Sequence, residues 1–227
     1  MPISWIIFGV FALLSWLVSM QLKHKFKEFS KIPVNYGLTG KDVAVRMLAD
    51  YGIYDVNVQS VEGALTDHYN PVNKTVNLSG AVFYGSNVAA AAVAAHECGH
   101  AVQHAKAYAW LTMRSSLVPV VSFASKWVMW VLLAGILMIE RFPNLLLIGI
   151  ILFATITLFS FITLPVEINA SKRALAWLTN AGITTHSTYP SAKSALNWAA
   201  CTYVVAALAS LAQLLYYLMI FLGRQRN

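Results

Sequence analysis

Charged residues are scarce in this sequence. Asp, Glu, Lys and Arg together make up 11% of its 227 residues, whereas a soluble domain typically carries about 25%. Hydrophobic residues make up 58%, so the shortage of charge indicates a protein that lies largely in lipid. The net charge is +7, but no cluster of basic residues forms the footprint of a nucleic-acid-binding protein. We therefore expect no nucleic-acid partner.

Cysteine is also rare, and its spacing argues against a cysteine metal site. The sequence contains only Cys98 and Cys201, and neither belongs to a Cys-x-x-Cys pair. Two isolated cysteines give no support for a disulfide and are typical of a reducing compartment.

The sequence contains several long segments of apolar residues. About 20 apolar residues cross a bilayer core as a helix, and four segments qualify: 1–22, 117–139, 144–164 and 199–222. The first lacks both the positive start and the small-residue cleavage site of a signal peptide, so we expect it to be a retained helix. The sequence thus predicts four transmembrane helices.

The positions of Lys and Arg predict which segments share one side of the membrane. Four lysines between Lys23 and Lys31 follow the first span directly. Because Lys and Arg gather on the cytoplasmic side, we expect residues 23–116 and 165–198 to face the cytoplasm. The short loop at Glu140 is then expected on the opposite side.

Residues 23–116 have the pattern of a small soluble α+β unit. Thr39 is expected to start a helix with a capping box. Val56 and Val58 alternate with polar neighbours, and the segments 65–70 and 75–78 flank an expected turn at 71–74, which together predict a short antiparallel sheet. Ser86 is then expected to cap a helix over 87–105, which is apolar almost all round and therefore buried.

This buried helix carries a sequence motif of potential metal ligands. His96-Glu97-Cys98-Gly99-His100 has the pattern H-E-x-x-H, and residues four apart lie on one face of a helix, so both imidazoles can bind one ion. Two histidines and a carboxylate are costly to bury unless they are paired or bind metal. We therefore interpret His96 and His100 as zinc ligands and Glu97 as the general base toward a zinc-bound water.

The third ligand must come from another part of the chain. His104 lies one turn beyond His100, but ligands eight residues apart span about 12 Å of helix and cannot all bind one ion at about 2.0–2.1 Å. Glu167 follows the third span on the same predicted side and is expected at the start of a helix. We predict Glu167 as the third ligand; the alternative is a carboxylate that only pairs with the helix dipole.

Two features of substrate binding stay open at this level. The second donor to an oxyanion could be His68, His186, Tyr189 or Arg173, and their spacing does not choose among them. A strand expected over 65–70 either borders the substrate cleft, where it pairs with an extended peptide, or is only part of the sheet.

The chain resembles the YugP-type neutral zinc metallopeptidases of bacterial membranes. The segments that carry the resemblance are residues 65–71, 77–79, 91–104, 164–174 and 202–208. The similarity covers nearly the whole chain, and the LPVE-x-NAS sequence at 164–171 combined with HExxH is specific. Two departures are Cys98, at a variable position of the motif, and Ile168, where an aromatic residue is expected.

The resemblance implies a zinc-dependent hydrolase similar in plan to the HtpX-like proteases. Its ligands to one zinc ion would be His96, His100 and Glu167, with Glu97 as base, as in gluzincin-like enzymes. The implied fold is a mainly α membrane protein, with four transmembrane helices and a small cytoplasmic α+β metallopeptidase unit that contains a short antiparallel sheet.

The predicted function is an endopeptidase in the inner membrane of a bacterium, with an active site that faces the cytoplasm and cleaves peptides or membrane-protein segments. One alternative is an intramembrane site-2-type protease, although no later span carries the Asp-Gly partner motif. Another is a non-catalytic metal-binding membrane scaffold, which would not need Glu97. The oligomeric state stays undetermined at this level.

Overall fold

The computed structural model describes residues 2–224, and the side chains of residues 5–223. Met1, at which the first predicted span begins, lies outside the described residues. Within the described range the chain forms seven α-helices, one short 3-10 helix and three β-strands.

The chain divides into two compact units. The first, here called the helical unit, contains residues 2–17, 112–164 and 202–224. The second, here called the α+β unit, contains residues 18–111 and 165–201.

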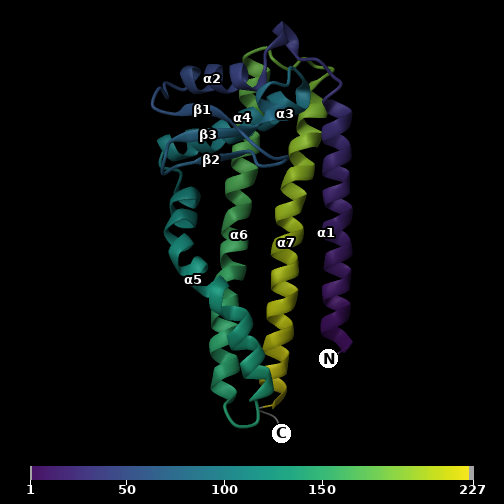
Figure 1. Cartoon of the computed structure of the whole chain (residues 1–227), viewed down its shortest axis with the longest axis vertical. Helices are drawn as coiled ribbons and strands as arrows, with labels where there is room; N and C mark the ends of the chain where they lie inside the picture. The colour runs from purple at the N-terminus through teal and green to yellow at the C-terminus, as the bar shows by residue number, and fades with distance from the viewer. Residues whose placement is uncertain (1, 225–227) are drawn as a thin grey trace. The chain divides into compact units, whose positions relative to one another are not determined.

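Four helices are long and apolar enough to cross a membrane. They are α1 (Pro2–Phe29), α5 (Ala109–Leu137), α6 (Pro143–Asn180) and α7 (Tyr189–Arg224) (Figure 1). Large apolar side chains such as Trp130 are exposed along them, as expected of a surface that faces lipid rather than water. The protein is therefore mainly helical, with four candidate membrane spans.

Helix α2 (Gly40–Asp50) starts as its sequence predicts. The Thr39 hydroxyl accepts a hydrogen bond from the Asp42 N–H at 3.2 Å, and the Thr39 N–H donates to Asp42 Oδ2 at 2.9 Å. This reciprocal capping box satisfies two amides at the helix start. The chain leaves the helix through Gly52, whose φ of 70° is open to glycine without strain.

The sheet contains β1 (Asn57–Val61), β2 (His68–Asn70) and β3 (Thr75–Ser79) in the order β1-β3-β2. β2 and β3 pair antiparallel, but β1 pairs parallel with β3, so the prediction of a purely antiparallel sheet is wrong. A parallel pair needs a long crossover, and residues 62–74 supply it. Alternation of side chains sets the period of a strand but not the direction in which it pairs.

Strand β2 is also shorter than expected. Leu65, at the start of the predicted strand 65–70, has a φ of 59° and belongs to the preceding loop. A positive φ is incompatible with an extended strand, which leaves His68–Asn70 as the paired segment.

Helix α4 (Val88–Ala105) lies at the centre of the α+β unit, directly after the short helix α3 (Gly80–Phe83). Its cap is Asn87 and not Ser86 as predicted: Asn87 Oδ1 accepts from the Ala90 N–H at 2.9 Å. Asn87 is the last residue with extended backbone angles, and Ser86 instead donates to the Gly37 carbonyl. The run of small residues lets neighbouring elements pack closely around α4.

Helix α6 does not stop where the apolar run ends. It continues from Pro143 to Asn180 through Pro165, so the prediction that Glu167 begins a helix is wrong. Pro165 removes one backbone hydrogen-bond donor, but the chain is α-helical both before and after it. Glu167 therefore lies inside a long helix, and the helix-dipole argument for its position does not apply.

Candidate metal centre

Helices α4 and α6 touch backbone to backbone at Gly99. A Cβ atom placed on Gly99 would lie 2.7 Å from the Ala170 carbonyl oxygen and 3.1 Å from Ala170 Cα. Gly99 directly precedes His100, and Ala170 lies nearly one turn beyond Glu167. The close approach that glycine permits thus brings the Glu167 carboxylate onto the face of α4 that carries the histidines.

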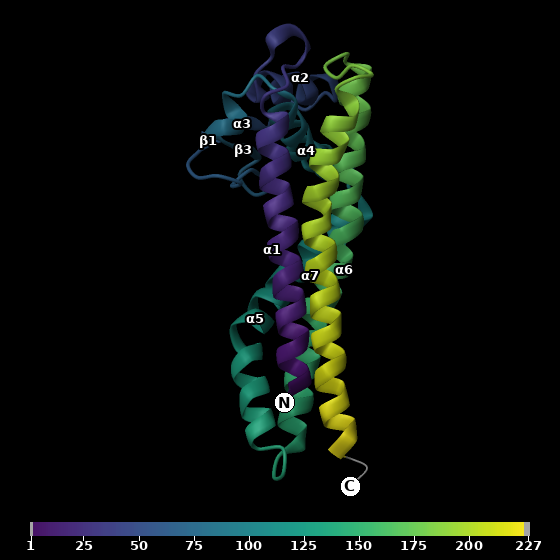
Figure 2. The ribbon, with the colours of Figure 1, turned by 90° about the vertical axis from the view of Figure 1, so that its right-hand side faces the viewer.

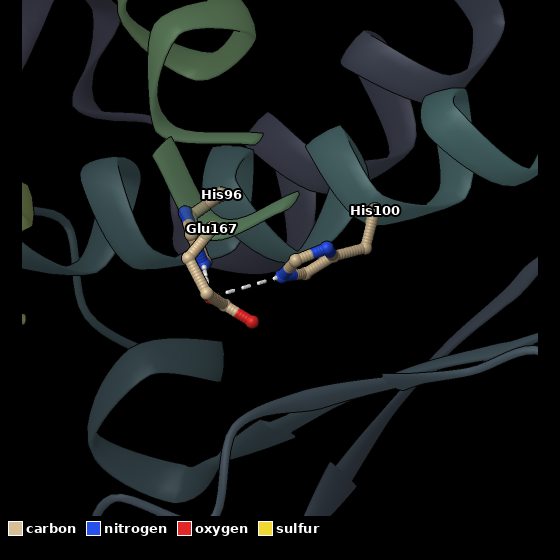
Figure 3. Close-up of side chains that lie close together, drawn as sticks. All are labelled: His96, His100 and Glu167. Atoms are coloured by element: carbon tan, nitrogen blue, oxygen red, sulfur yellow. Dashed lines mark hydrogen bonds and ion pairs between the residues drawn. The ribbon is translucent and has the colours of Figure 1, made fainter. Parts of the chain in front are cut away.

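His96, His100 and Glu167 form one compact cluster (Figure 3). Each side chain offers one ligand atom, and these atoms lie within 4.8 Å of one another. Glu167 Oε2 is 3.3 Å from His96 Nε2 and 3.5 Å from His100 Nε2. The structure therefore brings together the three residues that the sequence singled out as ligands.

The spacing and chemistry of these atoms fit a zinc ion. Two imidazole nitrogens and one carboxylate oxygen are a typical catalytic zinc set, which leaves a fourth position open. Tetrahedral ligands at about 2.0–2.1 Å from zinc lie about 3.4 Å from one another, close to the separations between Glu167 and the two histidines. These three residues could hold zinc with little rearrangement.

The outer nitrogen of each histidine has its own partner. Ser171 Oγ lies 3.1 Å from His96 Nδ1, and Gln103 Oε1 lies 3.1 Å from His100 Nδ1. Gln103 Nε2 donates to the Val166 carbonyl at 2.8 Å and to Asn169 Oδ1 at 3.0 Å. Because its amide nitrogen is used there, Gln103 accepts from His100 Nδ1–H, which leaves Nε2 of a neutral His100 ready for a metal.

Glu97 is held by the edge of the sheet. Its side chain is only 7% exposed, and its Oε2 accepts a hydrogen bond from the Tyr69 backbone N–H at 3.0 Å. Tyr69 is the middle residue of β2 and pairs across the strand with Val76. The edge of β2 thus orients the carboxylate that follows the first histidine of the motif.

The charge of Glu167 changes the protonation of its neighbour. Burial by itself lowers the pKa of His100, but the hydrogen bond and the negative charge of Glu167 outweigh burial and raise the pKa of His100 above its ordinary value. A proton therefore competes with a metal ion for His100.

The Cys98 side chain faces α2 and not the metal cluster. Its Sγ lies 3.6 Å from the Ala44 carbonyl oxygen on α2. Burial raises the pKa of the Cys98 thiol, which disfavours the thiolate that binds metals. Cys98 is therefore a packing residue within the motif.

The remaining residues considered for the site are separate from the cluster. His104 is exposed, and its Nδ1 lies 2.8 Å from the Tyr69 hydroxyl. Of the four candidate oxyanion donors, His186 and Tyr189 line a cavity between α6 and α7 whose wall also includes Ser171, the partner of His96. His68 adjoins Tyr69 on β2, and Arg173 Nε donates to Asn169 Oδ1 at 2.7 Å.

Comparison with known proteins agrees with this geometry. A family model described as "Putative neutral zinc metallopeptidase" matches residues 4–222. The chain belongs to this family. This metallopeptidase is 43% identical over 215 residues to the "Putative membrane protease YugP" of Bacillus subtilis (strain 168), a match that covers 94% of this chain and 95% of the relative. No solved structure matches it.

Family membership confirms the resemblance to YugP-type proteins seen in the sequence. At the level of the family, the protein is a zinc metallopeptidase and a hydrolase, and its four long apolar helices, like its membrane protease relative, make it a membrane protein.

Sequence reasoning missed three contacts around the metallopeptidase cluster. Helical spacing could have indicated two of them, because Gln103 follows His100 by three residues and Ser171 follows Glu167 by four. The third, from the Tyr69 N–H to Glu97, depends on how the sheet packs against α4, and no local pattern encodes it. Asn169 links Gln103 to Arg173.

Proposed function

We propose that this metallopeptidase is a membrane endopeptidase that hydrolyses peptide bonds with one zinc ion held by His96, His100 and Glu167. The observation that carries the proposal is the convergence of their ligand atoms within 4.8 Å, with Glu97 adjacent on the same helix. Substitution of Glu97 by Gln, with zinc content and peptide hydrolysis both measured, tests it; the Discussion gives the expected result.

The roles of the residues follow from their contacts. When bound, zinc would polarise the scissile carbonyl and lower the pKa of a water molecule to about 7. Glu97 would take the proton from the attacking water and later deliver it to the leaving amine. The Tyr69 N–H holds Glu97 Oε2, so the proton transfer falls to Oε1. The second donor to the oxyanion comes from one of the four candidates His68, Arg173, His186 and Tyr189.

The position of the site disfavours an intramembrane protease. Helix α4, which carries both histidines and the base, is not among the described helices long and apolar enough to cross a membrane. It packs instead within the α+β unit against α2 and the sheet. We infer that cleavage takes place outside the bilayer core.

A peptide substrate has a natural partner in β2. This strand lies at one end of the order β1-β3-β2, and its Tyr69 N–H already points at Glu97. We infer that an extended peptide adds to this edge by strand pairing, which would hold its scissile bond beside the metal.

Strand pairing predicts a two-residue period in the substrate. Once a cleaved peptide is found, N-methylation of each backbone amide in turn should block cleavage at alternate residues and spare those between, because alternate amides of a strand face the same neighbour. Cleavage rates measured by mass spectrometry give the pattern. Equal sensitivity at consecutive amides would rule out pairing with β2.

We propose that the protein lies in the inner membrane of a bacterium with the α+β unit in the cytoplasm. The support is the concentration of Lys and Arg in residues 23–116 and 165–198. A cysteine introduced as Val72→Cys, at a side chain 87% exposed, should react with a membrane-impermeant maleimide only after the cells are permeabilised.

The matched control for this topology is Phe142→Cys, in the loop between α5 and α6, where the native side chain is 56% exposed. It should react in intact cells. Reaction of the Val72→Cys variant in intact cells would reverse the proposed orientation.

A further inference from the structure

A cavity lies between the C-terminal part of α6 and the start of α7, within the α+β unit. Its volume is about 890 Å³, and the two helices run side by side here in both views (Figures 1 and 2). Ile168 on α6 and Ala200 on α7 line one end, and the turn that joins the helices, including Thr184 and His186, lines the other.

The cavity has a one-sided charge. Lys172, Lys193 and His186 line it, and none of its lining residues is acidic. No ion pair joins either lysine to a carboxylate of the described residues. Glu167 is the last acidic residue of the sequence, so residues 168–227 carry positive charge without any Asp or Glu. This surface favours an anionic ligand.

A buried hydroxyl in the wall of the cavity also requires a partner. Thr184 is only 5% exposed, and its Oγ1 has no hydrogen-bond partner among the described residues. A buried hydroxyl without a partner destabilises the folded state. Thr184 lines the cavity, so rotation of its side chain about χ1 would bring the buried hydroxyl to a ligand with acceptor oxygens, which would supply the missing bond.

The turn that carries Thr184 is held in place by its own contacts. The backbone N–H of Thr185 donates to Thr188 Oγ1 at 2.9 Å, and the Thr188 N–H donates to Thr185 Oγ1 at 3.2 Å. Gly182, with a φ of 68°, turns the chain away from the end of α6. The cavity is therefore preformed and does not need the ligand to shape it.

We propose that this cavity binds the phosphate headgroup of an anionic phospholipid. Basic pockets between helices at the membrane boundary bind such headgroups. Ile168 comes four residues after the predicted span 144–164, and Ala200 lies at the start of the span 199–222. The apolar end of the cavity thus adjoins the acyl-chain region, and Lys172, Lys193 and Thr184 receive the phosphate oxygens.

The test is a lipid titration of the purified full chain in a neutral detergent. Dihexanoyl phosphatidylglycerol should raise the unfolding temperature in a saturable way, because a ligand that binds only the folded state stabilises it. Dihexanoyl phosphatidylcholine and inorganic phosphate should each bind at least tenfold more weakly. Equal effects of phosphatidylcholine, or equally tight binding of free phosphate, would overturn the proposal of an anionic lipid site.

Two variants locate the site. The double substitution Lys172→Gln and Lys193→Gln should weaken phosphatidylglycerol binding at least tenfold, whereas Lys31→Gln with Lys41→Gln, which removes the same charge from exposed positions elsewhere, should not. An equal loss in both double variants would mean diffuse attraction to a basic surface and would overturn the proposal.

Thr184→Val gives a signature that simple damage to the fold does not produce. Without lipid, this variant should unfold at the same or a higher temperature, because a buried hydroxyl without a partner is replaced by a methyl group of similar shape. With phosphatidylglycerol, its rise in unfolding temperature should be smaller than that of the native protein. An undiminished rise would contradict the assigned role of Thr184. None of these readouts depends on peptidase activity.

Discussion

Substitution of Glu97 by Gln is expected to reduce peptide hydrolysis by about 10²–10⁴-fold, the usual contribution of a general base, while zinc remains bound. Gln cannot accept the proton of the attacking water. Its side-chain oxygen can still accept the hydrogen bond that the Tyr69 N–H donates to Glu97, so the edge of β2 should keep its place. Zinc content by atomic spectroscopy and cleavage of a fluorogenic peptide are the two measurements.

The control for this substitution is Glu62→Gln, which neutralises an exposed carboxylate just beyond β1 and should leave both quantities unchanged. Cleavage at the native rate by the Glu97→Gln variant would refute the assignment of the base. A native protein that binds zinc in a one-to-one ratio without cleaving any peptide would instead favour the metal-binding scaffold.

Substitution of Glu167 by Gln is expected to weaken zinc binding by more than about 100-fold and to abolish hydrolysis with it. Loss of a residue that only supports a ligand already costs about 10–100-fold in metal affinity, and the neutral amide of Gln is a weaker ligand than a carboxylate. Competition with a chromogenic chelator measures the affinity.

His104→Gln is the matched control, because it removes an exposed imidazole one turn beyond His100 that lies outside the cluster. It should retain zinc at the native affinity. Loss of zinc in this variant, or full retention in Glu167→Gln, would show that the third ligand has been assigned to the wrong helix.

A companion variant moves Glu167 without changing any ligand. Gly99→Ala places a methyl group 2.7 Å from the Ala170 carbonyl oxygen, so α4 and α6 must separate. We expect a destabilisation of about 1–3 kcal/mol, typical of overpacking, together with weaker zinc binding. Gly80→Ala, where a Cβ meets no atom within 4 Å, should change neither property.

Local patterns predicted the elements of the site better than their assembly. The capping box at Thr39 and the HExxH helix depend on contacts within a few residues, and the structure has them where the sequence put them. The direction of β1 and the continuation of α6 through Pro165 depend on contacts between distant segments. The prediction of Glu167 as a ligand rests partly on a helix start that the structure does not have. Its other basis, the position directly after the third span, agrees with the structure, where Glu167 lies beside both histidines.

By itself, the sequence determined the four apolar helices and the pairing of His96 with His100, because hydrophobic length and helical period are properties of neighbouring residues. Only the tertiary structure decided that Glu167 reaches both histidines, that Gln103 and Ser171 hold their outer nitrogens, and that the edge of β2 orients Glu97. Those contacts join residues from separate elements, and their distances depend on how closely α4, α6 and β2 pack.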